Sequence, residues 1–248
     1  MRIALMGQAA FGEKALQTLL DRGENVVCVF VPLGDPGRGA DPLKELALGR
    51  NIPVFEPPDL KDPRLADDYG RLAPDLGVMA FVTDIIPAPL LDIPKEGTIQ
   101  YHPSLLPRHR GGSAINWAVM GGEAGTGLTI FWPDGGIDTG PILLQKEVEI
   151  SPDDTTGSLY FNKLFLLGVE ALIEAIDLVG EGRAPRIAQD ESLATHEGLC
   201  REKDAVISWG EPAAGVYNLI RGTNPQPGAT TRYRGGELKI FDCRLLPE

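Results

Sequence analysis

Apolar and polar positions follow two different periods along the first 185 residues of the chain. Short apolar runs that stop at glycine, proline or a polar residue predict strands, and apolar residues at helical spacing predict helices. The predicted strands are residues 1–7, 25–32, 52–55, 76–81, 97–102, 127–132 and 142–150. The predicted helices are residues 11–22, 42–48, 63–71, 113–120 and 154–179. This alternation predicts an α/β fold with a doubly wound, mostly parallel sheet, in which a ligand binds at the carboxyl ends of the strands.

The ends of two predicted helices carry residues that favour capping. Ser113 stands at the start of one helix, and Asp153 or Asp154 stands at the start of the long helix over 154–179. Short polar side chains at these positions can accept a hydrogen bond from a free backbone N–H group of the first turn. We therefore expect Ser113 and one of the two aspartates to act as N-caps.

The pattern changes after residue 185, which predicts a domain boundary. Residues 1–185 form the expected main domain, and the polar, irregular residues 186–202 form the expected linker. Residues 203–248 contain one helical segment, the turn-rich TNPQPGA and strand-like segments ending in ELKIFDCRLL. Because this stretch is short for an independent core, we expect a small β-rich C-terminal module. It either packs on the main domain or is the truncated part of a longer module.

Composition places the chain among ordinary globular proteins. Of the 248 residues, 43% are hydrophobic and 23% are charged, and the net charge is −12. A broad nucleic-acid-binding surface is disfavoured because phosphate neutralisation needs clustered lysine and arginine. No signal peptide or unbroken apolar membrane span is recognisable. The thiols of Cys28, Cys200 and Cys243 lie far apart, with Cys28 in an apolar run that predicts a buried, inert thiol. We therefore expect a cytoplasmic protein with no membrane partner.

The glycines of the segment Gly7–Gly12 (GQAAFG) follow the first predicted strand. A dinucleotide-binding loop would need a further glycine, and a phosphate-binding loop would need lysine where Glu13 stands. The segment therefore predicts a tight turn between strand and helix. A nucleotide-binding oxidoreductase is the disfavoured alternative, and no nicotinamide cofactor is expected.

A first candidate site lies in the segment Gly97–Gly112 (GTIQYHPSLLPRHRGG). Side chains alternate along a strand, so Gln100 and His102 point to the same side, and Pro103 then ends the ladder. An amide and an imidazole thus meet at the carboxyl end of a strand, where an α/β fold binds its substrate. This placement favours a functional over a purely structural role for His102.

The rest of this loop offers weaker candidates. Ser104 is rejected as a nucleophile because no GxSxG elbow surrounds it. His109 is predicted to be solvated between Arg108 and Arg110, and the three histidines of the chain have no metal-ligand spacing, so no metal is expected. The two arginines either contact an anionic acceptor or simply form a charged loop.

A second candidate site is the loop Asp134–Gly140 (DGGIDTG), which joins two apolar strands. One interpretation is a plain turn. The other places the Asp138 carboxylate beside His102, where it favours the protonated imidazole. A charged imidazole can donate a hydrogen bond to a carbonyl oxygen that gains negative charge during a reaction.

These segments together resemble the formyltetrahydrofolate-dependent formyltransferase family. HPSLLPRHRGG followed by SAINWA is similar to the signature loop of the family, and GGIDTGPILLQKE is similar to its aspartate loop. The segments YHPSLLPRHRG, SAINW and LLQKE are especially similar in sequence to the N-terminal hydrolase domain of the 10-formyltetrahydrofolate dehydrogenases. In the tail, ISW, LIRG and PQPGA are similar to the C-terminal domain of methionyl-tRNA formyltransferases.

The resemblance implies roles for individual residues. His102 and Asp138 match the catalytic histidine and aspartate, and Gln100 stands where formyltransferases usually carry asparagine. The loop FVTDIIP matches the segment that lines the pterin pocket. The residues expected to bind the folate are Phe81, Asp84, Ile85, Ile86 and Asp138.

The resemblance also implies the activity. The chain is expected to remove the formyl group from 10-formyltetrahydrofolate and to pass it to an acceptor nucleophile, with no metal. The acceptor is an amine, a carrier thiol or water, and with water the protein is a 10-formyltetrahydrofolate hydrolase. The acidic charge disfavours tRNA as a partner but leaves it open. A non-catalytic folate-binding protein is the alternative of another class.

Overall fold

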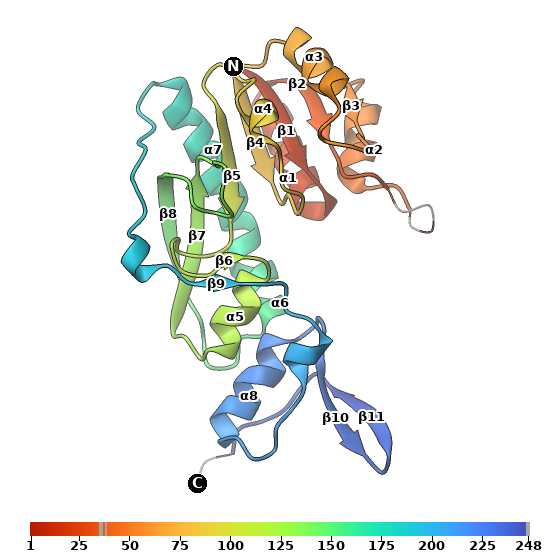
Figure 1. Cartoon of the computed structure of the whole chain (residues 1–248), viewed down its shortest axis with the longest axis vertical. Helices are drawn as coiled ribbons and strands as arrows, with labels where there is room; N and C mark the ends of the chain where they lie inside the picture. The colour runs from red at the N-terminus through yellow and green to blue at the C-terminus, as the bar shows by residue number, and fades with distance from the viewer. Residues whose placement is uncertain (35–36, 38, 247–248) are drawn as a thin grey trace. The chain divides into compact units, whose positions relative to one another are not determined.

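The computed structural model describes residues 1–34, 37 and 39–246. Its central feature is a seven-stranded sheet with the strand order β3-β2-β1-β4-β5-β7-β8 (Figure 1). The strands from β3 to β5 in this order are parallel to their neighbours, and β7 is antiparallel to β5. The prediction of a mostly parallel sheet is therefore confirmed. The strands of this sheet are β1 (Arg2–Gly7), β2 (Asn25–Phe30), β3 (Val54–Phe55), β4 (Leu76–Ala80), β5 (Thr98–His102), β7 (Gly125–Phe131) and β8 (Ile142–Glu149).

Every predicted strand and helix of the first 185 residues is present, with its ends within two residues of the prediction. The helices α2 and α3 begin where the side chains of Asp41 and Asp62 accept hydrogen bonds from Leu43 N and Arg64 N, each followed by a proline. The α-helices are α1 (Ala9–Asp21), α2 (Pro42–Gly49), α3 (Pro63–Arg71), α4 (Ala88–Leu91), α5 (Ala114–Met120), α6 (Thr156–Leu159), α7 (Phe165–Gly180) and α8 (Ala213–Gly222). The one-turn helix α4 was not predicted.

The predicted cap of the long helix is wrong. Thr155 caps α6, because its hydroxyl accepts from Ser158 N at 3.0 Å while the Ser158 hydroxyl accepts from Thr155 N at 3.0 Å. The carboxylate of Asp154 instead accepts from Lys163 Nζ at 2.6 Å and from Ser151 N at 2.8 Å. The predicted single helix also contains a π-helical turn, η1 (Tyr160–Leu164), between α6 and α7.

Ser113 stands at the predicted N-cap position of α5 but makes no capping hydrogen bond. Its backbone is left-handed, with φ +60°, and its hydroxyl oxygen accepts from Cys200 N at 3.1 Å. A contact with a residue far along the chain has taken the place of the local bond that the sequence predicted.

The chain forms two compact units, each built from three separate stretches. The first unit is Met1–His102, Thr129–Leu144 and Gly168–Gln189, and the second is Pro103–Leu128, Gln145–Leu167 and Asp190–Glu248. The predicted division into residues 1–185, 186–202 and 203–248 stays a prediction.

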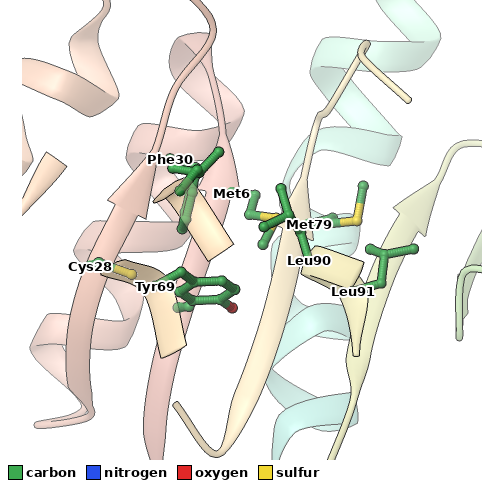
Figure 2. Packing of buried hydrophobic residues seen from close by; sticks show 9 residues of the cluster. Met6, Cys28, Phe30, Tyr69, Met79, Leu90 and Leu91 are labelled. Atoms are coloured by element: carbon green, nitrogen blue, oxygen red, sulfur yellow. The ribbon is translucent and has the colours of Figure 1, made fainter. Parts of the chain in front are cut away.

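Figure 2 shows the packing of one core cluster of the first unit, where side chains of β1, β2, β4, α3 and α4 meet. Phe30 stacks on Phe55 with ring centroids 4.7 Å apart and meets Tyr69 edge to face at 4.9 Å. Cys28 is fully buried in this cluster, as predicted, and its burial raises its pKa to about 12. The buried residues of the cluster are Ala4, Met6, Cys28, Phe30, Leu65, Tyr69, Met79, Leu90 and Leu91.

The second unit has a small core of its own. Helices α5 and α8 pack together, with Asn116 Nδ2 donating to Gly222 O at 2.8 Å. Ile207, Ile220 and Ala229 form a separate buried cluster between α8 and the hairpin of β10 and β11. The remaining short elements of the chain are β6 (Arg110–Gly111), β9 (His196–Glu197), η2 (Glu191–Leu193), η3 (Glu202–Ala205), β10 (Ala229–Tyr233) and β11 (Gly236–Ile240).

Candidate active site

A cavity of about 470 Å³ lies in the first unit at the carboxyl ends of β1, β2 and β4. Parallel strands bring their carboxyl ends to one edge of the sheet, and the connections that follow them enclose the space. The wall is mostly apolar, with a few polar side chains, as is usual for a small-molecule site. The lining residues are Met6–Gln8, Phe30–Leu33, Pro57–Lys61, Phe81–Pro87 and Leu90.

The loop after β4 forms one wall of this cavity. Phe81, Asp84, Ile85 and Ile86, the residues expected to contact a pterin, all line it. Phe81 has a left-handed backbone, with φ +63°, so the chain turns sharply as it leaves the strand. Ile85 is 80% exposed, which leaves a large apolar side chain free to be covered by a ligand.

The turn between β1 and α1 forms a second wall. Gly7 packs so closely against the carbonyl oxygen of Ala80 that a Cβ atom would overlap it, which requires glycine there. Gln8 lines the cavity and donates from Nε2 to Thr83 Oγ1 at 3.2 Å, so the two walls are joined. The predicted tight turn is confirmed, but Gln8 was not recognised as a residue of the site. Its position directly after a parallel strand was the signal that could have found it.

His102 and Asp138 come together beside this edge of the sheet. The His102 side chain is 6% exposed and that of Asp138 is 10% exposed, and Nδ1 lies 3.5 Å from Oδ2. His102 ends β5, and Asp138 comes from the loop between β7 and β8. The predicted pairing of imidazole and carboxylate is thus present in the structure.

The register of the sheet relates His102 to the cavity. Met79 of β4 pairs with Gln100 of β5 in a parallel ladder. β4 ends at Ala80, directly before the cavity-lining Phe81, and β5 ends at His102. Neighbouring strands are about 4.8 Å apart. The histidine therefore ends the strand next to β4, whose following loop lines the cavity, and alternation puts Gln100 on the same face of β5. The described residues that line the cavity do not include Gln100, His102 or Asp138.

The loop that carries Asp138 is tightly built. Asp134 Oδ1 accepts from Gly136 N at 2.9 Å and from Thr139 Oγ1 at 2.6 Å. Gly140 lies against the carbonyl oxygen of Trp132, with no room for a Cβ atom. The alternative interpretation as a plain turn is incomplete, because the turn presents a buried carboxylate to His102.

The prediction that His109 is solvated is wrong. Its side chain is buried rather than solvated, with Nε2 2.9 Å from Glu123 Oε1 and Nδ1 3.4 Å from Glu197 Oε1. Its backbone N–H donates to Thr195 Oγ1 at 2.7 Å. The charged sequence neighbours suggested exposure, whereas the partners that bury the ring are distant in the sequence.

The two arginines of this loop that were predicted to bind an acceptor differ in their exposure to solvent. Arg110 is 1% exposed and donates from both terminal nitrogens to Glu191, at 2.9 and 2.6 Å. Arg108 is exposed. Ser104 is buried and its hydroxyl donates to the carbonyl oxygen of Arg108 at 2.6 Å, which agrees with rejecting it as a nucleophile.

Among the residues that the structure describes, no helix is long and apolar enough to cross a membrane. Within the same residues, no group of three or more histidine, cysteine, aspartate or glutamate side chains is arranged to hold a metal ion.

Comparison with known proteins gives the class of the protein. A family model described as formyl transferase matches residues 1–176, and one described as formyl transferase, C-terminal domain, matches residues 200–248. The chain therefore belongs to the formyl transferase family.

Individual relatives place the chain within that family. The chain is 43% identical over 251 residues to the mitochondrial 10-formyltetrahydrofolate dehydrogenase of Mus musculus, covering 99% of this chain and 27% of the relative. It is 42% identical over 245 residues to the methionyl-tRNA formyltransferase of Trichlorobacter lovleyi, covering 97% of this chain and 77% of the relative. This chain thus spans only a small part of the dehydrogenase and most of the transferase.

A solved structure has the same fold. HypX from Aquifex aeolicus, in complex with tetrahydrofolic acid, matches with a TM-score of 0.74 and 21% sequence identity. The match covers 98% of this chain and 37% of HypX.

Proposed function

We propose that this protein removes the formyl group from 10-formyltetrahydrofolate and passes it to an acceptor nucleophile. The observation that carries the proposal is the buried pair of His102 and Asp138, 3.5 Å apart at the carboxyl end of β5. A cavity of about 470 Å³ lies in the same unit, lined by the loop that follows the neighbouring strand β4. Membership of the formyl transferase family and the names of the two relatives support the same donor.

In the proposed reaction, His102, Gln100 and Asp138 have separate roles. The nucleophile attacks the formyl carbon, and negative charge develops on the formyl oxygen. The imidazole of His102 and the amide of Gln100 donate hydrogen bonds to this oxygen, and one such donor is typically worth roughly 3–4 kcal/mol. Asp138, 3.5 Å from the imidazole, orients the ring and accepts the proton that the nucleophile loses, directly or through water. The bond from carbon to N10 then breaks, N10 takes up the proton that Asp138 accepted from the nucleophile, and tetrahydrofolate leaves as the formyl group stays on the acceptor.

The folate is proposed to bind in the cavity of the first unit. Phe81, Ile85 and Ile86 supply apolar surface for the pterin ring. Asp84 and the backbone groups of the same loop supply polar partners for the ring edge, which carries alternating donors and acceptors. Asp138 contacts the formyl end of the molecule.

Water is the second candidate acceptor, which would make the protein a 10-formyltetrahydrofolate hydrolase. It is favoured by the 41–44% identity to proteins named 10-formyltetrahydrofolate dehydrogenase over nearly the whole of this chain. It is also favoured by Gln100, which extends its amide one methylene further than the asparagine expected of a transferase. With water, the products are formate and tetrahydrofolate.

An amine is the third candidate acceptor, and it is supported by the relative named methionyl-tRNA formyltransferase. The net charge of −12 weighs against tRNA. Arg108, exposed in the loop after β5, is the basic side chain proposed to meet an anionic acceptor, because Arg110 is engaged with Glu191. A carrier thiol is a further candidate acceptor of the formyl group.

Variants of the pair test the catalytic assignment. His102→Ala and Asp138→Ala are each expected to lower the rate of tetrahydrofolate release by about a hundredfold or more, since each removes a group that acts on the transition state. His196→Ala, which changes an exposed histidine, is the matched control and should keep the rate of the unmodified protein. Near-normal turnover of either site variant would overturn the assigned roles.

One assay separates the acceptors. The protein is mixed with 10-formyltetrahydrofolate alone, and tetrahydrofolate and formate are followed. Release without an added acceptor identifies a hydrolase, whereas release only with methionyl-tRNA or an amino sugar identifies a transferase. Folate binding in a titration, with no release under any condition, would mean a non-catalytic folate-binding protein and would overturn the proposal.

A cytoplasmic location is also proposed. It is supported by the three cysteines, which are all free thiols in the structure, as expected in a reducing compartment. A relative named cytosolic 10-formyltetrahydrofolate dehydrogenase, from Xenopus tropicalis, points the same way.

A further inference from the structure

Gln189 holds the loop that carries Asp138. Its Nε2 donates to the carbonyl oxygen of Asp138 at 2.9 Å and to that of Gly140 at 2.7 Å. Both N–H groups of one amide therefore bind main-chain acceptors on the two sides of Thr139. The bonds come from a residue that follows α7 and lies in the stretch predicted to be a linker.

The loop needs support because its backbone is in an unfavourable conformation at the functional residue. Asp138 has φ +55°, a left-handed conformation that costs a residue with a Cβ atom roughly 1–2 kcal/mol. Such a conformation persists only where surrounding contacts enforce it. The hydrogen bonds that Asp134 accepts from Gly136 and Thr139 brace the loop from within. Gln189 braces the second half, which includes Asp138, from another part of the chain.

Gln189 is itself fixed in position. Two residues before it, Ile187 exchanges backbone hydrogen bonds with Ile142 of β8, at 2.7 and 2.9 Å. The segment is thus attached to the same strand that the Asp138 loop enters. Gln189 is half-buried, so solvent competes only in part with its hydrogen bonds.

We propose that Gln189 is a positioning residue that keeps the Asp138 carboxylate directed at His102. This inference rests on the proposed function for its effect on rate, but not for its effect on the loop. Without the amide, the carbonyl oxygens of Asp138 and Gly140 lose its hydrogen bonds, and the left-handed conformation loses its external brace. A displacement of about 1 Å at a catalytic group can cost on the order of a hundredfold in rate.

Two variants of Gln189 and one control test the proposal in the full chain. Gln189→Met keeps the length of the side chain and removes the donors, and Gln189→Lys restores donors to the same place. Gln17→Met is the matched control, because Gln17 donates to Asp21 on α1, away from the site. For each, kcat and KM with 10-formyltetrahydrofolate are measured, together with hydrogen–deuterium exchange of residues 134–140 in the protein without substrate.

We expect the loss of the Gln189 amide to change kcat much more than KM. Gln189→Met should lower kcat by about tenfold or more while KM stays within about twofold, because substrate binding does not use the amide. Its loop should exchange faster, with the exchange of β1 and β4 unchanged. Gln189→Lys should recover most of kcat and of the protection, and Gln17→Met should match the unmodified protein.

The exchange measurement keeps the two proposals distinguishable. If the unmodified protein shows no turnover, the proposed function fails, and loop exchange alone decides the role of Gln189. Unchanged exchange in Gln189→Met overturns the positioning role whatever the kinetics. Faster exchange with an undiminished kcat also overturns it, since the loop would then not need the brace for catalysis.

Discussion

At the scale of single residues, two histidines show how position in the fold decides chemistry. His102 lies at the end of β5 beside one carboxylate, on the strand next to β4, whose following loop lines the cavity. His109 is also buried, but it lies between the carboxylates of Glu123 and Glu197. The Nδ1 atom of His102 faces the carboxylate of Asp138, whereas both ring nitrogens of His109 face carboxylates.

His109 is therefore expected to contribute to stability. His109→Leu leaves two partly buried carboxylates facing an apolar side chain, and it should lower the free energy of unfolding by about 1–3 kcal/mol. Urea denaturation followed by circular dichroism measures the change. His196→Leu, at an exposed position one residue before Glu197, should be close to neutral. Equal effects of the two variants would contradict the stabilising role of His109.

The burial of Cys28 makes a second residue-scale prediction. Because its pKa is raised to about 12, its thiol is almost entirely protonated at pH 8 and unreactive. Iodoacetamide at pH 8 should leave Cys28 unmodified in the folded protein and should modify it in 6 M guanidinium chloride, as read by peptide mass spectrometry. Rapid labelling in the folded protein would show that the core around Cys28 opens.

At the scale of elements, the start of the long helix depends on a polar cluster rather than on a single cap. Lys163 Nζ, in the π-helical turn η1, donates to Asp154 Oδ2 at 2.6 Å and to Ser151 Oγ at 3.0 Å. The cluster links the end of β8, the cap of α6 and η1. A π-helical turn points its side chains differently from an α-helix, and here it directs Lys163 to the residues that precede the helix.

The cluster predicts a pH dependence of stability. Partial burial acts to raise the pKa of Asp154, but hydrogen bonds from Lys163, Ser151 and Ser158 outweigh it and lower that pKa. A lowered pKa in the folded state stabilises the protein above the unfolded value of about 3.9. This stabilisation is lost as pH falls through the folded value, which lies below the unfolded one.

Asp154→Asn tests this dependence. At pH 7 the variant should have a free energy of unfolding lower by roughly 1–2 kcal/mol. The difference from the unmodified protein should shrink as the pH falls below about 4 and through the lower folded value, because the wild-type carboxylate then takes up a proton, first in the unfolded and next in the folded state. Urea titrations at several pH values measure it, with Asp67→Asn, an exposed position on α3, as the control. A difference that stays constant down to acid pH would contradict the role of the charge.

At the scale of the whole molecule, each compact unit is assembled from three separate stretches of chain. The sequence pattern follows the chain in order, so it predicted contiguous domains of residues 1–185 and 203–248. The stretch 186–202 was assigned to neither. It carries Gln189, which braces the Asp138 loop in the first unit, and Glu197, which pairs with His109 in the second.

The candidate site was predictable to different degrees. The sequence predicted that Asp138 lies beside His102, and it singled out the loop from Phe81 to Ile86, because motif and strand alternation are local properties. The roles of these residues in the reaction stay predictions. Gln8 and the cavity residues of 57–61 were not found, since they join the site only when separate connections meet at one edge of the sheet. Gln189 was missed for the same reason.

The sequence by itself determined the strands and helices, the mostly parallel sheet and the chemical groups of the site. Each of these depends on the spacing of side chains along a short stretch, which is set by the geometry of strand and helix. Only the tertiary structure decided which distant partners each group meets. It buried His109 between two carboxylates, placed Arg110 on Glu191 and gave the Asp138 loop its brace from Gln189. These partners are tens of residues apart, and only the packing of the folded chain brings them within hydrogen-bonding distance.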